Sequence, residues 1–589
     1  MSQDQETTRK LSEVEHIKAA SNYLRGNVAK ELAEPTETFS KESVQILKHH
    51  GMYQQEDRDR RGKKGPDGKP LSKAYSLMLR VKTPGGQLTC DQFLAELEIA
   101  DKWAGGTMRI TNRQDIQFHW VLKGNVREVI RRINEVQLTT FGACGDVERN
   151  VMCCPAPLNT DPVQLANQQL AVRLSNHLLP RTRAYHEIWL TDLETGEKTD
   201  CTEVPDSGEA EPLYGRTYLP RKFKTAIARL EDNCVDVYTN DMGFVSIREG
   251  DRLLGYNVLV GGGLGVTPSD KDTFPRLADR LTFVKPEEVI GIAEAVIKFQ
   301  RDFGNREDRK RARLKYVVAD WGIERVREKV AEYFGRPLAL PLEVEVTGFD
   351  DHIGWHEQGD GRWFYGLNVE NGRVIDRPDM RLKTALWEVC RRLRPGVRLT
   401  PHQSVIFTDI QPADRATLES ILRDHGVPLH DEISEVLRWS MSCVALPTCG
   451  LAVTESERVL PGIIDQLEGE IAAIGLQKEQ FTVRMTGCPN GCGRPYNADI
   501  GLVGRTKNKY TIYLGGRLVG DRLGVPYLEL VPLEQIVPTL VPVLQLFREY
   551  RADGETVGDF CHRVGVDWIR EKLGHSKTAS PEETAVLEE

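Results

Sequence analysis

The sequence has no apolar run that reaches the roughly 18 residues needed to cross a membrane. Cysteine is scarce, at 12 of 589 residues, which excludes a small scaffold held together by disulfides. Positive charge is not in excess, because 78 basic against 87 acidic residues give a net charge of −9. That balance argues against a general nucleic-acid binder. Hydrophobic residues at 40% and charged residues at 28% are ordinary for a globular chain, which excludes collagen-like and disordered classes.

The N-terminal segment MSQDQETTRKLSEVEHIKAA also lacks the apolar stretch of a secretory signal. Its acidic residues are untypical of an organellar transit peptide. We therefore expect the chain to stay in the cytoplasm, where thiols are kept reduced. Its 589 residues correspond to about four domain-sized units of roughly 150 residues each.

Two parts of the sequence repeat the same order of motifs, which indicates an internal duplication. RITNRQDIQF at 109–118 resembles RLTPHQSVIF at 398–407, and LRVKTPGGQL resembles LNVENGRV. Further along, NDMGFV resembles ADIGLV, and VLVGGGLG resembles IYLGGRLVG. Each pair is weak alone, but their shared order predicts one module that is present twice. The first copy has more cations at matched positions, and the second has clustered cysteines.

Hydrophobic periodicity predicts the elements of the first copy. We expect a strand at 76–82, a helix at 90–104, one continuous strand at 108–121 and a helix at 125–136. Residues 1 to about 65 are polar and predicted to be rich in helix, ending in a charged loop.

Four cysteines are bunched, and their spacing points to a metal or cluster centre. Cys443 and Cys449 lie in CVALPTC, Cys488 and Cys492 lie in TGCPNGCG, and a helix is expected between them at 455–474. Four thiolates are the usual ligands of an iron–sulfur cluster. On spacing alone, a zinc site and a set of buried free thiols stay open. For the other eight cysteines we expect ordinary core positions.

Cations placed between apolar residues are the second unusual feature, because an unpaired charge is costly to bury. Arg80 and Arg149 are two of them, and Lys222 and Lys224 lie two residues apart in LPRKFK. The expected strand at 108–121 adds a face of evenly spaced polar residues. These are Arg109, Thr111, Arg113, Gln117 and His119. A polyanionic ligand at the point where these segments converge would offset the cost of burial.

A basic run at 300–316 and a glycine run at 260–263 are further candidates for anion binding. For the basic run, a solvated helix face is the simplest interpretation, and RNA binding is the weakest because aromatic residues are not interleaved. A third interpretation of the basic run is that Arg309 and Arg313 bind the carboxylates of a large cofactor. Gly261 and Gly262 offer backbone N–H groups to the same anion, although a glycine run alone is weak support.

Together, CVALPTC, TGCPNGCGRP, RITNRQ, LPRKFK and VGGG resemble the sulfite and nitrite reductase family, and within it the assimilatory sulfite reductase hemoproteins. The resemblance runs from HHGMYQQEDRDRR to GDFCHRVG, nearly the whole chain. It implies an enzyme with a siroheme and one [4Fe–4S] cluster joined by a shared thiolate. It also implies an α+β fold of internally duplicated siroheme-reductase architecture, with two ferredoxin-like half-domains and two α/β domains that bind siroheme and cluster.

The resemblance assigns roles to individual residues. The cluster ligands correspond to Cys443, Cys449, Cys488 and Cys492, and the axial ligand of siroheme corresponds to Cys492. The catalytic cations around the substrate match Arg80, Arg149, Lys222 and Lys224. The siroheme-lining segments contain Arg109, Thr111, Arg113, Gln117, His119 and Asn490, to which we add Gly261, Gly262, Arg309 and Arg313 as candidates.

Six segments are expected in order along the chain. They are a helical extension at 1–70, a ferredoxin-like half-domain at 71–140, a siroheme- and substrate-binding domain at 141–345, a second half-domain at 346–430, a cluster and siroheme domain at 431–575 and a polar tail at 576–589.

The reaction implied by the resemblance is the six-electron reduction of sulfite to sulfide for cysteine biosynthesis. Bound cations would compensate the charge of the oxyanion, with Lys222 and Lys224 as proton donors. The sequence has no recognisable flavin or nicotinamide motif, so we expect a separate electron donor, either an NADPH-oxidising flavoprotein subunit or ferredoxin. We expect no nucleic-acid or membrane partner. The alternatives are a siroheme nitrite reductase and a non-catalytic zinc or iron–sulfur protein.

Overall fold

A computed structural model describes residues 10–182, 184, 189–191, 195–196, 198–200, 211–268 and 270–575. The polar tail at 576–589 and Cys201 therefore lie outside the described residues. The lead-in folds into three short helices, which are α1 (Glu13–Ala20), α2 (Val28–Ala33) and α3 (Lys41–Leu47). In the described part of the chain, no helix combines the length and apolar character that a bilayer span requires.

The first of four five-stranded sheets follows the lead-in, and two helices belong to it. Its strand order is β1 (Met52–Glu56), β2 (Tyr75–Val81), β5 (Ile116–Val121), β4 (Met108–Ile110) and β15 (Arg373–Val374). The helices are α4 (Cys90–Trp103) and α5 (Val126–Glu135). Apart from the continuous strand at 108–121, the elements predicted for the first copy are therefore present within a residue or two.

The strand predicted at 108–121 is wrong as one element, because a turn splits it into β4 and β5. The Thr111 hydroxyl accepts hydrogen bonds from the backbone N–H groups of Arg113 and Asp115, both at 3.2 Å. Gln114 has a φ of 58°, in the left-handed region and far from the φ near −140° of a regular antiparallel strand. A threonine that bonds its neighbouring backbone competes with the strand ladder. Arg109 and Arg113 therefore do not share one strand face.

A second copy of this sheet lies in the other half of the chain. Its order is β13 (Gly354–Glu357), β14 (Trp363–Leu367), β17 (Val405–Ile410), β16 (Gly396–Leu399) and β3 (Gln87–Leu88), and its helices are α10 (Leu382–Leu393) and α11 (Arg415–Asp424). Both sheets contribute to one apolar core.

The two copies exchange a short strand, which ties the halves together. β3 of the first half pairs with β16, and β15 of the second half pairs with β4. The turns before them need glycine, because a Cβ on Gly86 would lie 2.3 Å from the Leu399 carbonyl oxygen and one on Gly372 would lie 2.1 Å from that of Ile110. The reciprocal exchange confirms that the matched motifs are a duplication.

The remaining two sheets are also copies of each other. One runs β12 (Asp279–Val284), β11 (Arg252–Val260), β10 (Met242–Glu249), β9 (Phe223–Arg229) and β6 (Glu148–Cys153). The other runs β22 (Val525–Pro532), β21 (Lys509–Leu514), β20 (Ile500–Thr506), β19 (Val483–Thr486) and β18 (Ser440–Ser442). In both, the first two pairings in this order are antiparallel and the last two are parallel.

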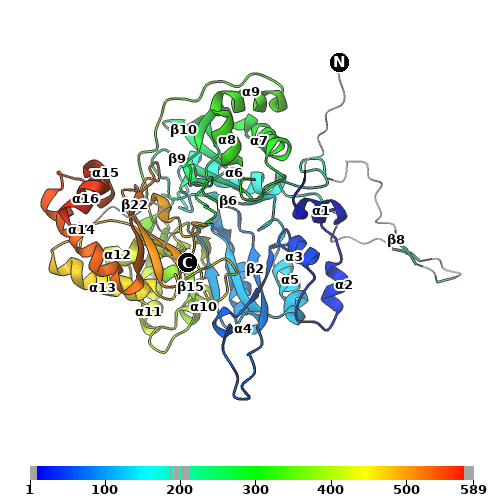
Figure 1. The fold of residues 1–589 in the computed structure, drawn as a ribbon, viewed down its shortest axis with the longest axis horizontal. Coiled ribbons are helices and arrows are strands. Elements are labelled where there is room, and N and C mark those ends of the chain that lie inside the picture. Colours follow the sequence, from blue (N-terminus) through cyan, green and yellow to red (C-terminus); the bar gives the residue numbers. More distant parts are fainter. Residues whose placement is uncertain are drawn as a thin grey trace, which may run out of the picture.

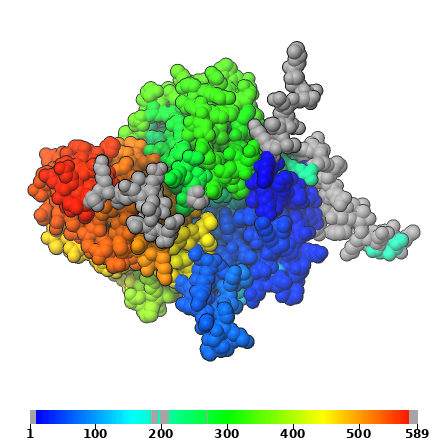
Figure 2. Space-filling model, viewed as in Figure 1, coloured from blue at the N-terminus to red at the C-terminus, as the bar shows by residue number. Residues whose placement is uncertain are grey.

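Helices surround these two sheets (Figure 1). Those of the first are α6 (Pro162–His177), α7 (Val289–Phe303), α8 (Leu314–Trp321) and α9 (Ile323–Phe334). Those of the second are α12 (Glu435–Arg438), α13 (Leu460–Ala473), α14 (Ile536–Tyr550), α15 (Val557–Val564) and α16 (Val566–Lys572). A separate strand pair is formed by β7 (Trp189–Thr191) and β8 (Lys198–Asp200). The blue N-terminal part, the green middle and the orange C-terminal part pack against one another (Figure 2).

The helix expected between the cysteine pairs is present as α13, but it begins five residues later than predicted. The basic run at 300–316 is not a solvated helix face, because most of it forms the connection between α7 and α8. Its cations are paired with acids from distant segments, such as Arg306 with Glu15 and Arg309 with Asp146.

Candidate functional site

One pocket lies where the β9 sheet of the first half meets the cysteine loop of the second. Arg113 reaches it from the turn between β4 and β5, and Lys222 and Lys224 reach it from the start of β9. The second half contributes Asn490 and Cys492. The cations on its wall are Arg113, Lys222, Lys224, Arg313 and Arg494, and the described wall residues include no carboxylate. The pocket is therefore suited to a polyanion.

The side-chain amines of Lys222 and Lys224 have neither an ion pair nor a hydrogen bond among the described residues of the chain. Burial, together with the nearby charges of Arg221, Arg149 and Arg313, lowers the pKa of Lys222 to about 7. Burial also holds the pKa of Lys224 well below its usual value, with help from Lys222 and Arg113. Protonated lysines here lack a counter-charge, which an anionic ligand would supply.

Two of the three arginines on the same wall, Arg113 and Arg313, are held in place as follows. Arg113 donates to the Asn240 side-chain oxygen at 2.9 Å and to the Asn150 carbonyl at 2.5 Å. Arg313 makes a bidentate pair with buried Asp241, at 3.1 and 2.7 Å. Rigid guanidinium groups of this kind lose little entropy on binding a carboxylate or an oxyanion.

The four clustered cysteines lie in two loops of the second half. Cys443 directly follows β18, and its sulfur accepts from the Gly487 N–H at 3.3 Å and from the Thr486 hydroxyl at 3.4 Å. Burial, together with the neighbouring cysteines, raises the pKa of Cys449 to about 11 and that of Cys488 to about 12. Four thiolates can therefore coexist here only with a metal or cluster that supplies positive charge.

Cys492 connects the cysteine loops with the cation pocket. It is exposed and belongs to the pocket wall, whereas Cys488 is buried. Asn112 donates from its side-chain amide to the Cys492 carbonyl at 2.5 Å, which fixes the loop against the first half. Sequence reasoning missed Asn112, Asn240 and Asp241. Asn112 lies inside the RITNRQ motif and could have been found there. Asn240 and Asp241 could be recognised only from the three-dimensional structure.

Two of the predicted catalytic cations lie outside the pocket wall. Arg80 lies 4.0 Å from a carboxylate oxygen of Asp115. Arg149 donates to the Gly145 carbonyl at 3.1 and 3.2 Å and contacts the Tyr53 hydroxyl at 3.5 Å. The charge of Arg149 nevertheless contributes to the lowered pKa of Lys222, so it lies within electrostatic reach of the pocket.

The polar residues predicted on one strand face take separate positions. Arg109 pairs with Glu457 at 2.9 Å and donates to the Ser442 carbonyl at 2.9 Å, just before the first clustered cysteine. Gln117 and His119 are buried on β5, and burial lowers the pKa of His119 well below its usual value. Thr111 forms the turn described above.

Three further candidates are engaged by protein groups. Arg309 makes a bidentate pair with Asp146, at 2.9 and 3.2 Å. The N–H groups of Gly261 and Gly262 donate to the backbone carbonyls of Asp241 and Asn240, both at 2.9 Å. The expectation that these two N–H groups are free for an anion is therefore wrong for this structure. Gly265, four residues further on, does belong to the pocket wall.

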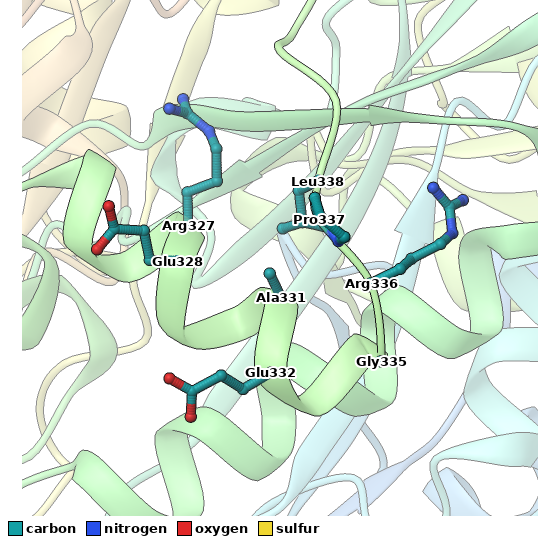
Figure 3. Close-up of a pocket in the computed structure, with 8 residues that line it drawn as sticks. All are labelled: Arg327, Glu328, Ala331, Glu332, Gly335, Arg336, Pro337 and Leu338. Carbon is teal, nitrogen blue, oxygen red and sulfur yellow. The ribbon is translucent and has the colours of Figure 1, made fainter.

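A second hollow lies between α9 and the chain that follows it (Figure 3). Its wall includes Arg327, Glu328, Glu332 and Arg336, whose side chains point away from one another (Figure 3). It holds neither cysteines nor converging cations, so the chemistry belongs to the pocket at Cys492.

Two protein-family models match most of this chain. A family described as "Nitrite and sulphite reductase 4Fe-4S domain" matches residues 171–338 and 436–580. A second, described as "Nitrite/Sulfite reductase ferredoxin-like half domain", matches 70–136 and 356–425. The chain belongs to the nitrite and sulphite reductase family. Each of the two domain types occurs twice, which agrees with the duplicated sheets.

Members of this family with similar sequences include two kinds of sulfite reductase. The chain is 42% identical over 563 residues to a "Sulfite reductase [NADPH] hemoprotein beta-component" of Staphylococcus haemolyticus, covering 95% of this chain and 96% of the relative. It is also 42% identical to the "Sulfite reductase [ferredoxin]" of Synechococcus elongatus, covering 96% and 91%. Among solved structures, the Mycobacterium tuberculosis NirA protein matches with a TM-score of 0.75 and 27% identity, covering 96% and 98%.

The family cofactors, siroheme and a [4Fe–4S] cluster, fit the residues present. Siroheme carries eight carboxylates, and the pocket offers cations without a competing carboxylate on the described wall. The cysteine loops offer four thiols beside it, of which Cys492 faces the pocket. Small residues let these loops pack closely, since a Cβ on Gly493 would lie 2.3 Å from the Met485 carbonyl oxygen.

Proposed function

We propose that this chain is an assimilatory sulfite reductase hemoprotein that reduces sulfite to sulfide with six electrons. The observation that carries the proposal is the pocket at Cys492, where Lys222, Lys224, Arg113 and Arg313 converge on one space. The sulfite reductases named among its relatives support the same activity.

In this proposal Cys443, Cys449, Cys488 and Cys492 would hold the cluster, and Cys492 would also hold the siroheme iron. The exposure of Cys492 toward the pocket supports the double role. When bound, siroheme would supply the redox-active iron for the reduction, and the cluster would supply electrons. Asn112 would keep the Cys492 backbone in place through its 2.5 Å hydrogen bond.

Lys222 and Lys224 compensate the substrate charge and deliver protons in this proposal. Sulfite must lose three oxygens as water, so protons have to reach each oxygen. Burial lowers the pKa of Lys222 to about 7, which places its proton release near neutral pH. Arginine stays protonated, so Arg80 and Arg149 are assigned to compensation of the substrate charge.

The siroheme carboxylates need partners away from the substrate, and Arg113 and Arg313 are assigned to them with Asn490 beside them. Arg109, Thr111, Gln117 and His119 would support this wall through the β4–β5 turn. The electrons would come from a separate protein, either an NADPH-oxidising flavoprotein or ferredoxin. Relatives of both kinds match at 42% identity, so the comparison favours neither donor.

The test uses the full chain purified with its cofactors. A small-molecule reductant replaces the donor protein, and sulfide is measured as the product. We expect absorption bands of siroheme and cluster together with sulfite turnover. Nitrite turnover that exceeds sulfite turnover in kcat/KM would make the chain a siroheme nitrite reductase. A colourless protein that binds zinc alone would refute both activities.

A further inference from the structure

Four polar side chains meet in the apolar core of the first half, outside the pocket at Cys492. Cys154 directly follows β6, Asp232 and Cys234 lie in the loop after β9, and His352 lies just before β13. Each is at most 3% exposed. One ligand atom from each lies within 4.8 Å of the others. The Cys154 sulfur lies 2.8 Å from an Asp232 oxygen and 3.5 Å from the His352 Nε2, which lies 3.2 Å from the same oxygen.

The groups around this cluster point its ligand atoms inward. The other Asp232 oxygen accepts from the backbone N–H groups of Cys234 and Asp350, at 3.0 and 3.3 Å. The second carboxylate oxygen of Asp232 faces the cluster and also lies 3.9 Å from the Arg229 guanidinium. The other ring nitrogen of His352, Nδ1, lies 3.4 Å from an Asp350 oxygen. A histidine that binds a metal almost always donates its second N–H to such an outer partner.

The duplication relates this cluster to the cysteine loops of the second half. Within matched sheets, Cys153 pairs with Ile227 and Ser442 pairs with Met485, so Cys154 and Cys443 each follow the last residue of a matched strand. Further on, Asp236 and Arg494 each precede a matched short helix and have left-handed φ values of 49° and 57°.

Cys234 and Cys492 each lie two residues before that left-handed residue. Two of the four cluster cysteines therefore have cysteine counterparts in the first half, which are Cys154 and Cys234. The same backbone that presents thiols to a metal centre in one half presents thiols to a common point in the other.

We propose that Cys154, Asp232, Cys234 and His352 bind one Zn²⁺ ion as a closed structural site. Zinc prefers four sulfur, nitrogen and oxygen ligands in a tetrahedron, with Zn–S near 2.3 Å and Zn–N or Zn–O near 2.0–2.1 Å. Those lengths put neighbouring ligand atoms about 3.3 to 3.8 Å apart. The separations here, from 2.8 Å to no more than 4.8 Å, bracket that interval. Small side-chain shifts would complete the geometry.

This site goes beyond the proposed reduction of sulfite and has a structural consequence. His352 lies in the segment that joins the two halves, between α9 and β13. A zinc ion would fasten that segment to the β6 and β9 ends of the first half. The ion would thus link the two halves at a second place, in addition to the exchanged strands β3 and β15.

The experiment measures zinc in the cofactor-loaded full chain, purified without a metal-affinity tag or chelator. We expect about one zinc per chain by mass spectrometry of the metals. X-ray absorption at the zinc edge, which siroheme and cluster iron do not obscure, should show two sulfur and two nitrogen or oxygen neighbours. C234A and H352A should each lower the zinc content at least tenfold. C90A, which removes a buried cysteine elsewhere, should not change it.

Three results would overturn the proposal. Zinc below a tenth of an ion per chain, even after incubation with zinc chloride and desalting, would mean that the four groups form only a hydrogen-bonded cluster. Four sulfur neighbours would place the zinc in the Cys443–Cys492 loops instead. Zinc that persists in both C234A and H352A would place it elsewhere. The absorption measurement needs no variant, so misfolding of a variant cannot hide the answer.

Discussion

Replacing Lys224 with asparagine tests whether positive charge in the pocket selects sulfite over nitrite. Lys224 lies on β9, two residues after Lys222, and lines the pocket with Arg113 and Arg313. On an extended chain both lysine side chains project to one side. Asparagine keeps a polar group but removes the charge and a proton. Sulfite brings more negative charge than nitrite and has three oxygens to lose, so it depends more on this residue.

The size of the effect follows from one lost charge-assisted contact in the transition state. Such a contact contributes about 1.5 to 3 kcal/mol. Because about 1.36 kcal/mol is a factor of ten in rate, kcat/KM for sulfite should fall roughly 10- to 150-fold. For nitrite we expect a much smaller fall or an increase. The partly buried position of Lys224 in the pocket keeps the contact from being fully screened by water.

The assay compares kcat/KM for the two substrates with a small-molecule reductant, each normalised to siroheme content. K298N is the matched control, because Lys298 on α7 lies outside the pocket and pairs with Glu294 at 3.1 Å. The control should leave both substrates unchanged. If K224N leaves the sulfite-to-nitrite ratio unchanged, or lowers both activities by one factor, the charge does not select the substrate and the reasoning fails.

Three other expectations concern separate parts of the site. C492S should uncouple siroheme from the cluster in absorption and electron paramagnetic resonance spectra. C153S is its control and should keep native spectra while losing only about 1 to 3 kcal/mol of stability. Native spectra and turnover in C492S would contradict the shared thiolate. R309Q should lower the free energy of unfolding by about 1.5 to 3 kcal/mol, because it removes the 2.9 Å partner of buried Asp146 and leaves it Lys18 at 3.7 Å. Siroheme content should stay constant; loss of siroheme would instead make Arg309 a cofactor contact. Because the pKa of Lys222 is lowered to about 7, its protonated fraction falls above that pH, so sulfite turnover should decline above pH 7 in a pH profile and K222M should lack this decline.

Much of the fold was predictable, because it depends on local pattern and on repetition. The order of the matched motifs predicted the duplication, and the strand predicted at 76–82 corresponds to β2 (Tyr75–Val81). The strand exchange was not predictable, since β3 and β15 have two residues each. Their partners lie far along the chain, since Gln87 pairs with Arg398. Two residues contain too little pattern to indicate a partner.

Some residues of the site were also predictable from the sequence, and others were not. Lys222, Lys224 and Cys492 stand in compact motifs, and the structure places them on one pocket. Arg309 looked equally promising in its basic run, yet Asp146 engages it. A sequence shows that a cation exists but not which distant acid neutralises it. Asp241 illustrates the same limit, because it holds Arg313 in place from 72 residues away.

The contact between the two halves shows why a duplicated protein must diverge at its centre. Asp236 and Arg494 take matched positions in the two copies and share the left-handed conformation. They are also paired with each other, at 2.5 Å. An unchanged duplication would set two aspartates or two arginines against each other there, buried and repelling. With the acid in one copy and the base in the other, the loops that bear Cys234 and Cys492 pack together across a buried ion pair.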